Sequence, residues 1–240
     1  MFVHAKGLPA GAFRMARQEV GILAVLILAA GGAWIFLALA DEVQEGDTAG
    51  FDRAILLALR SPTDIANPIG PPWFESMVRD VTALGSNFVL SFVTLAVLGY
   101  LLLDRKRAAT LLLLGSVGGG EILGNVLKLV FARARPDLVP HGVEVFTASF
   151  PSNHAMDSAI TYLTLGVLLA RLELKRRFKV YFLAVAVLLT LLVGASRLYL
   201  GVHWPTDVLA GWTLGAAWAM AVWLVALVLQ RRGKVEATGN

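Results

Sequence analysis

The segment VYFLAVAVLLTLLVGASRLYL, from Val180 to Leu200, contains one charged side chain, Arg197, in a run of otherwise uncharged and mostly apolar residues. About 20 consecutive apolar residues are enough for an α-helix to cross the hydrocarbon core of a membrane. The segment therefore predicts a membrane-spanning helix. A charge close to the end of such a run is costly unless it is paired or has a function.

Five further apolar runs lie on either side of this segment. The 240-residue chain is 57% hydrophobic and 16% charged, whereas soluble proteins average about 45–50% apolar and about 25% charged residues. We therefore expect an all-α fold, an integral membrane bundle of six transmembrane helices in a single domain over residues 1–232, with a disordered tail at 233–240. The five runs cover approximately Val20–Ala40, Ala83–Leu103, Ala108–Phe131, His154–Ala170 and Val208–Leu229.

The Lys and Arg residues are distributed unevenly between the two sides of such a bundle. If the N-terminus is inside, the inner segments hold fourteen of the 21 cationic residues. Because short cytoplasmic loops are enriched in Lys and Arg, both termini are predicted to be cytoplasmic. The fourteen residues are Lys6, Arg14, Arg17, Arg105, Lys106, Arg107, Arg171, Lys175, Arg176, Arg177, Lys179, Arg231, Arg232 and Lys234.

The first run has a second interpretation, as a cleaved signal peptide. Ala38-Leu39-Ala40 resembles a cleavage site. The run is longer than the usual apolar region of a signal peptide, which has about 7–15 residues. We therefore favour a retained span, and cleavage would not change the topology of the rest.

Residues 41–82 form a long outer segment between the first two spans. Phe51–Arg60 is apolar with charges at its edges, which is typical of a short helix lying at the membrane interface. Pro68, Pro71 and Pro72 are expected to break any helix that follows. We favour a packing lid over the bundle for this segment, and a gate for lipid access is the alternative.

Three polar clusters lie at the outer ends of predicted spans. They are Lys128–Pro136 (KLVFARARP), Phe150–His154 (FPSNH) and Ser196–Asp207 (SRLYLGVHWPTD). Since the charge distribution places all three on the same side of the membrane, they can converge on one site.

The cations of these clusters point to an anionic ligand. Lys128, Arg135 and Arg197 have no matching acidic run, and guanidinium groups bind phosphate oxygens in bidentate fashion. Ser152 lies where a helix is expected to begin, so its hydroxyl and the unpaired backbone N–H groups form an anion site. The pattern predicts a phosphate-binding site. Arg133 lies in the same cluster and has no assigned role.

Two histidines supply the groups that phosphoryl transfer needs. His203 and Asp207 are four residues apart, which puts both side chains on one helix face. Asp207 can hold one imidazole nitrogen, which leaves the other as a nucleophile. His154 can protonate the leaving oxygen as a general acid. No metal or other cofactor is required.

A metal site is the alternative interpretation of the His203-x3-Asp207 spacing. Such a site needs further carboxylate or His ligands, and the chain has no cysteine to add a thiolate. The neighbouring cations Lys128, Arg135 and Arg197 would also repel a divalent ion. We therefore expect no metal ligands here.

The motifs K-x6-R-P at Lys128–Pro136, P-S-x-H at Pro151–His154 and S-R-x5-H-x3-D at Ser196–Asp207 resemble the tripartite signature of the type 2 phosphatidic acid phosphatase family. The resemblance implies His203 as nucleophile, Asp207 as its partner and His154 as general acid. It also implies a phosphate site made by Lys128, Arg135, Ser152, Asn153 and Arg197.

Bacterial members of that family include phosphatidylglycerophosphate and undecaprenyl diphosphate phosphatases. The resemblance therefore implies an enzyme that hydrolyses a lipid phosphate monoester or diphosphate through a phosphohistidine. It also implies a place in the bacterial inner (plasma) membrane with the site facing the periplasm or exterior. Its expected partners are a lipid phosphate and membrane lipid, with no nucleic acid.

The chain departs from the family pattern at one position. Asn153 stands where the second motif usually has Gly, which would let the backbone approach a phosphate closely. We expect Asn to tolerate the positive φ of such a turn but to add bulk beside the anion. Reduced activity or an altered substrate would follow. A protein that binds or transports a lipid phosphate without hydrolysing it is therefore the alternative.

Two acidic residues in the spans lie outside the three motifs. Glu121 shares a helix face with Asn125 and Lys128, and a structural role is favoured over a catalytic one. Asp157, one turn after His154, is expected to orient that histidine or to line the headgroup pocket.

Overall fold

The computed structural model describes residues 10–141, 143 and 147–231, so the predicted tail at 233–240 lies outside the described residues. The described residues form eight helices and one two-stranded antiparallel sheet. The helices are α1 (Ala10–Glu45), α2 (Ala49–Ala58), α3 (Pro72–Ala83), α4 (Asn87–Leu103), α5 (Arg107–Phe131), α6 (Asn153–Leu172), α7 (Arg176–Tyr199) and α8 (Pro205–Arg231). The strands are β1 (Arg60–Ser61) and β2 (Asp64–Pro68).

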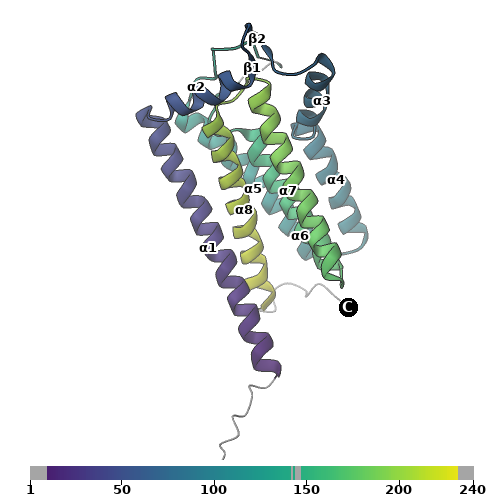
Figure 1. Ribbon diagram of the computed structural model, residues 1–240. Coiled ribbons are helices and arrows are strands. Elements are labelled where there is room, and N and C mark those ends of the chain that lie inside the picture. Colours follow the sequence, from purple (N-terminus) through teal and green to yellow (C-terminus); the bar gives the residue numbers. More distant parts are fainter. Residues whose placement is uncertain (1–9, 142, 144–146, 232–240) are drawn as a thin grey trace, which may run out of the picture.

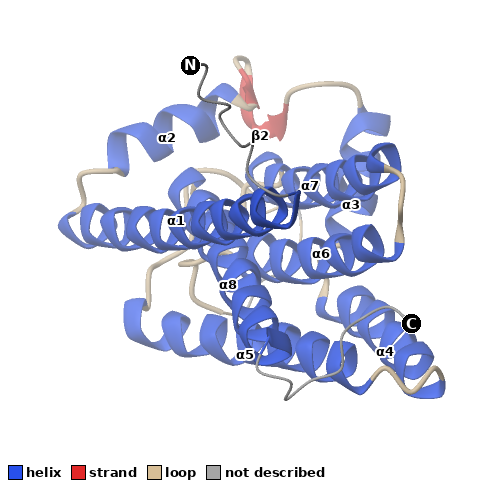
Figure 2. Ribbon diagram, turned by 90° about the horizontal axis from the view of Figure 1, so that it is seen from below, coloured by secondary structure: helices blue, strands red, loops and turns tan. Residues whose placement is uncertain are grey.

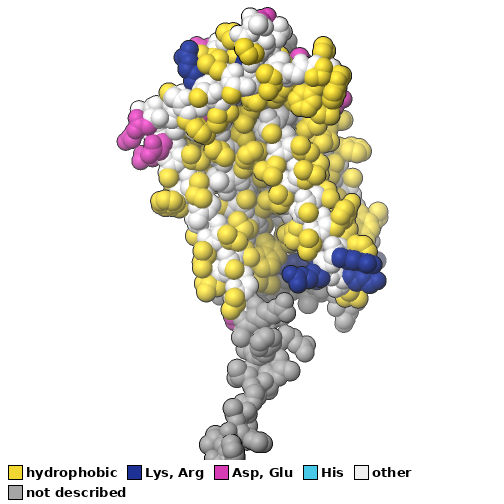
Figure 3. All heavy atoms as spheres, in the orientation of Figure 1, with side chains coloured by type: hydrophobic (Ala, Val, Ile, Leu, Met, Phe, Trp, Pro, Cys, Tyr) yellow, Lys and Arg dark blue, Asp and Glu magenta, His cyan; other side chains and the backbone are white. Residues whose placement is uncertain are grey.

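The bundle confirms the expected membrane architecture. Five helices in the described part are long and apolar enough to cross a membrane, namely α1, α5, α6, α7 and α8. Helices α3 and α4 meet at an angle of 46°, and counting this bent pair as one span brings the described part to six candidate spans by length and composition. Large apolar side chains are exposed along the outside of the bundle, as expected for a surface that faces lipid (Figure 3).

Helix α6 forms the centre of the bundle. It packs against α5, α7 and α8 (Figure 2). In its most apolar stretch of 18 residues 61% is buried, against 28% or less in the other four long spans. Glycines allow α8 to approach it closely, because a Cβ on Gly211 would lie 2.7 Å from the Ser152 carbonyl oxygen. A Cβ on Gly215 would lie 2.6 Å from the Met156 carbonyl oxygen. The start of α8 is thereby held against the start of α6.

The outer segment differs in part from its prediction. The expected interfacial helix is present as α2, but Pro72 does not break a helix. It begins α3, since the first helical position tolerates a residue without a free N–H. The hairpin of β1 and β2 was not predicted. The apolar helix of the second predicted span, α4, begins at Asn87 rather than Ala83, and the Ser86 hydroxyl caps it by accepting a hydrogen bond from Val89 N at 3.3 Å.

The three polar clusters meet at one end of the bundle. This end contains the last turns of α5 and α7 and the first turns of α6 and α8, and α2, α3 and the hairpin cover it (Figure 1). Helix α1 begins and α8 ends at the opposite end. The topology therefore places the predicted site residues within reach of one another.

Candidate active site

The loop between α7 and α8 fixes the position of His203. Gly201 has a φ of +70°, which glycine adopts without steric cost. A Cβ at this position would lie 2.6 Å from Val139 Cγ2 and 2.7 Å from an Arg60 nitrogen, so a larger residue would be strained and would displace its neighbours. Pro205 then begins α8, and the His203 side chain is left only 2% exposed.

His203 and Asp207 lie next to each other, as their spacing predicts. His203 Nδ1 is 3.4 Å from Asp207 Oδ2, which is at the long limit of a hydrogen bond. The same carboxylate oxygen accepts hydrogen bonds from the Ser149 hydroxyl at 2.5 Å and from Trp204 N at 2.8 Å. Asp207 is fully buried, so its orientation is set by these donors.

The other ring nitrogen of His203 faces the cations. Arg135 Nη1 lies 3.1 Å from His203 Nε2. Because a guanidinium can only donate, Nε2 carries the lone pair in this arrangement and Nδ1 carries the proton. Burial lowers the pKa of His203 to about 3, although its hydrogen bond to Asp207 opposes the shift. The imidazole is therefore neutral at pH 7, which a nucleophile requires.

Arg133 and Asp52 extend this network beyond the residues that the sequence predicted. Arg133 donates to Asp207 Oδ1 at 2.6 Å and to Asp52 Oδ2 at 2.7 Å. Asp52 also accepts from Thr206 N at 2.9 Å and from the Thr206 hydroxyl at 2.7 Å. Both carboxylates are fully buried, and such charges are stable only when they are paired and hydrogen-bonded. Asp52 is the one acidic residue in the apolar Phe51–Arg60 stretch, and it was not recognised from the sequence as part of the site.

The three predicted phosphate-binding cations are brought together. Lys128 and Arg197 are 6% and 3% exposed, and with Arg135 and His203 they lie close enough to His154 to interact with it electrostatically. None of the three cations forms an ion pair with a carboxylate in the described part of the chain. Their charges are therefore available to an anion.

Backbone carbonyls and threonine hydroxyls orient these cations. Lys128 Nζ donates to Ala148 O at 2.5 Å, and Arg135 Nε donates to Thr147 O at 2.7 Å. Arg197 Nη1 donates to the Thr82 hydroxyl of α3 at 2.9 Å, while its Nε has no partner in the described residues. Helix α3 of the outer segment thus holds one of the three cations.

The start of α6 offers further donors. Ser152 is fully buried, and its hydroxyl has no hydrogen-bond partner among the described residues. The first N–H groups of a helix also lack partners within the helix and favour an anion. A buried, unpaired hydroxyl at a helix N-terminus fits the predicted phosphate-binding role.

Asn153 corrects one part of the sequence analysis. The residue is the first of α6 and does not have a positive φ, so the expected left-handed turn is wrong. Its side chain lies against α5, with Oδ1 at 3.3 Å from the place of a Cβ on Gly124. The position thus needs no special backbone conformation, because the helix begins one residue earlier than expected.

His154 lies beside the bend between α3 and α4. Its Cδ2 would be 3.3 Å from a Cβ on Gly85, and its ring has no hydrogen bond to the described residues. The imidazole is therefore free to exchange a proton with a ligand.

A cavity of about 320 Å³ lies between α4, α5 and α6, and both polar and apolar side chains line it. Its lining includes Glu121, Asp157 and Thr161. One carboxylate oxygen of Asp157 and the Thr161 hydroxyl are buried without a partner among the described residues. Of the two roles expected for Asp157, its position agrees with lining a pocket.

Comparisons with known proteins agree with the resemblance. Residues 109–231 match the PAP2 superfamily. Phosphatidylglycerophosphatase B of Bacillus subtilis (strain 168) is 35% identical over 182 residues, which cover 75% of this chain and 85% of that protein. Undecaprenyl-diphosphatase of Sulfolobus acidocaldarius is 31% identical over 147 residues, which cover 58% of this chain and 61% of that protein.

The fold is also that of a solved relative. The crystal structure of a transmembrane PAP2-type phosphatidylglycerolphosphate phosphatase from Bacillus subtilis superposes with a TM-score of 0.76 at 29% sequence identity. The superposition covers 89% of this chain and 100% of that one. Sequence, fold and the order of the three motifs therefore agree, and this chain belongs to the PAP2 superfamily.

Proposed function

We propose that this protein hydrolyses a lipid phosphate through a phosphohistidine formed on His203. The two relatives described above are named as a phosphatidylglycerophosphatase and an undecaprenyl-diphosphatase. The observation that carries the mechanism is the placement of His203 between Asp207 at Nδ1 and Arg135 at Nε2.

The first step transfers the phosphoryl group to the enzyme. The lone pair of His203 Nε2 attacks phosphorus, and the bond between phosphorus and the lipid oxygen breaks. His154 gives its proton to that oxygen, so the lipid leaves as an alcohol, or as a monophosphate if the substrate is a diphosphate. Arg135 must move from Nε2 to a phosphate oxygen, where its charge offsets the charge of the transition state.

The second step releases phosphate. Water attacks the phosphohistidine, and His154 takes the proton of that water. The bond between Nε2 and phosphorus breaks, and its electrons return to the imidazole. Asp207 stabilises the positive charge that the ring carries while it is phosphorylated.

We propose that the reaction needs no metal ion. Lys128, Arg135 and Arg197 supply the positive charge, and their presence opposes binding of a divalent cation. Within the described ranges, no three His, Cys, Asp or Glu side chains are grouped closely enough to hold a metal. EDTA is therefore expected to leave the rate unchanged.

We also propose that the site faces the outside of the membrane and that both termini are cytoplasmic. The support is the excess of Lys and Arg at the opposite end of the bundle. In a bacterium, the substrate would then be a lipid of the outer leaflet of the inner membrane.

Phosphate release by the purified, detergent-solubilised protein tests the proposal. Phosphatidic acid, phosphatidylglycerophosphate and undecaprenyl diphosphate would be assayed side by side. His203→Ala should abolish release, and His141→Ala should retain it, because His141 binds Pro136 O outside the cation cluster. Rapid acid-free quenching with a radiolabelled substrate should show a base-stable phosphoprotein that His203→Ala lacks.

Two outcomes would contradict the mechanism. Full activity of His203→Ala would exclude it as the nucleophile. Binding of all three lipids without turnover by the unmutated chain would favour a lipid-phosphate binding or transport protein, which is the alternative that Asn153 raises.

A further inference from the structure

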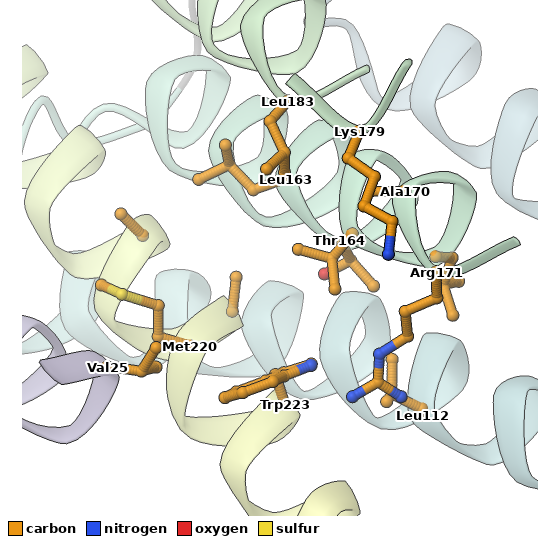
Figure 4. Close-up of a pocket in the computed structure, with 14 residues that line it drawn as sticks. Val25, Leu112, Leu163, Thr164, Ala170, Arg171, Lys179, Leu183, Met220 and Trp223 are labelled. Atoms are coloured by element: carbon orange, nitrogen blue, oxygen red, sulfur yellow. The ribbon is translucent and has the colours of Figure 1, made fainter. Parts of the chain in front are cut away.

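A second, larger cavity lies at the end of the bundle opposite the candidate active site. Its volume is about 430 Å³, and α1, α5, α6, α7 and α8 all contribute to its wall (Figure 4). Most of the wall is apolar and includes Leu112, Leu163, Leu183 and Met220. The cavity shares no residue with the phosphate site or with the 320 Å³ cavity between α4, α5 and α6.

The shape of the cavity suits a lipid chain. On α6 the lining runs from Leu163 to Arg171, which is about 12 Å along the axis at about 1.5 Å per residue. The hydrocarbon core of one leaflet is about 15 Å deep. The bundle surface is hollowed between α7 and α8 near this end, and Lys and Arg side chains border the hollow (Figure 3). The cavity thus reaches from the charged edge of the bundle through most of one leaflet.

Two cations lie at the rim of the cavity. Arg171 lies in the last turn of α6 and Lys179 in the first turn of α7, and both side chains line the same side of the wall (Figure 4). Neither forms a salt bridge with a carboxylate in the described part of the chain. No carboxylate of the described residues therefore neutralises their charges.

Trp223 is a third polar residue at the rim of the cavity, next to Arg171. The Arg171 guanidinium lies over the Trp223 ring, with Cζ at 5.4 Å from the ring centroid, which holds it in place. The indole Nε1 is buried and has no acceptor among the described residues. An unpaired donor beside two unpaired cations indicates a ligand with anionic and acceptor oxygens.

We propose that this cavity binds an anionic phospholipid of the leaflet opposite the active site. One acyl chain would occupy the apolar space, Arg171 and Lys179 would hold the headgroup phosphate, and Trp223 would donate to an ester oxygen. A zwitterionic lipid fits less well, because its ammonium group would approach the same two cations. The site is independent of the proposed reaction, since its residues do not contact the catalytic ones.

Lipid binding to the full-length protein in detergent, measured by native mass spectrometry, tests this site. Phosphatidylglycerol is the probe, with phosphatidylcholine of identical chains for comparison. Arg171→Gln should weaken phosphatidylglycerol binding by about tenfold or more, because a hydrogen bond to a charged group is lost. Arg176→Gln is the matched control and should change binding by less than about twofold, since it removes a cation of the same end that does not line the cavity.

Two further comparisons separate the cavity from other sites. Dihexanoyl phosphatidylglycerol, which keeps the phosphate but cannot fill the cavity, should bind much more weakly than the long-chain lipid. Arg197→Gln, at the active site, should leave binding unchanged. Any of four results would overturn the proposal. These are equal effects of Arg171→Gln and Arg176→Gln, equal binding of the two headgroups, binding that does not depend on chain length, and loss of binding in Arg197→Gln.

Discussion

Arg133 joins Asp207 to Asp52, with its two terminal nitrogens at 2.6 and 2.7 Å from the two carboxylates. Asp207 Oδ2 lies 3.4 Å from His203 Nδ1, and Asp52 belongs to α2 of the outer segment. The outer segment is therefore more than a cover over the bundle. It supplies a buried anion without which Arg133 would be held by a single carboxylate.

Arg133→Gln is expected to lower kcat by about 10- to 100-fold with little change in KM. The reason is that Asp207 loses a charged hydrogen bond, worth about 1.5–3 kcal/mol, while the phosphate-binding cations stay in place. Arg133→Lys should recover only part of the rate, because an ammonium group cannot span both carboxylates as a guanidinium does. Steady-state kinetics in detergent would measure both variants.

The matched control for this prediction is Arg53→Gln. Arg53 is exposed on the same helix as Asp52, so its substitution should change kcat and KM very little. Asp52→Asn should resemble Arg133→Gln. An increase in KM with unchanged kcat would instead place Arg133 in direct contact with the phosphate.

Thr82→Val is expected to raise KM by about tenfold. The substitution keeps the size of the side chain but removes the hydroxyl that accepts a hydrogen bond from Arg197, so this cation is no longer oriented toward the site. Thr94→Val is the control, because the Thr94 hydroxyl is buried without a partner in the described residues and its loss should not reduce activity or stability. Equal kinetics for the two variants would show that Thr82 does not position Arg197.

Stability should fall in acid because of His203. Burial lowers the pKa of His203 to about 3 from 6.5, so between these values the unfolded chain binds a proton that the folded protein does not. The free energy of unfolding should therefore decrease by up to about 1.4 kcal/mol for each pH unit below 6.5. Thermal unfolding of wild type and His203→Gln between pH 4 and 8 would isolate this effect. The free energy of unfolding of wild type minus that of His203→Gln should be constant above pH 6.5 and should decrease below it. Parallel pH dependences of the two proteins would contradict the lowered pKa of His203.

Asn153→Gly is expected to increase phosphate release. Glycine removes side-chain bulk from the first residue of α6, next to the unpaired Ser152 hydroxyl. The measurement is kcat/KM on the best lipid substrate. An unchanged value would show that Asn153 is accommodated against Gly124 and does not disturb the anion.

The sequence predicted the spans well because their length and hydrophobicity are imposed by the membrane itself. It also predicted which polar residues meet, since motifs at alternate ends of successive spans must lie on the same side. Helix α3 was missed because Pro72 was interpreted as a break, although a proline can equally begin a helix.

The contact between Asp52 and Arg133 could not be predicted in the same way. The two residues are 81 positions apart and lie in an outer segment and a loop, where hydrophobic periodicity carries no information about register. The assigned roles of His203, His154, Asp207 and the phosphate-binding residues stay predictions until they are assayed.

Phe36 of α1 stacks on Phe150, with ring centroids 5.8 Å apart, and Phe150 stands two residues before Ser152. Phe131, at the end of α5, contacts the same ring. The first span therefore supports the loop that enters α6 through this aromatic contact. Replacing or shortening that span would remove the packing against Phe150 and so displace Ser152 at the start of α6. This would happen even though none of the side chains of the span contacts the substrate phosphate in the proposed mechanism.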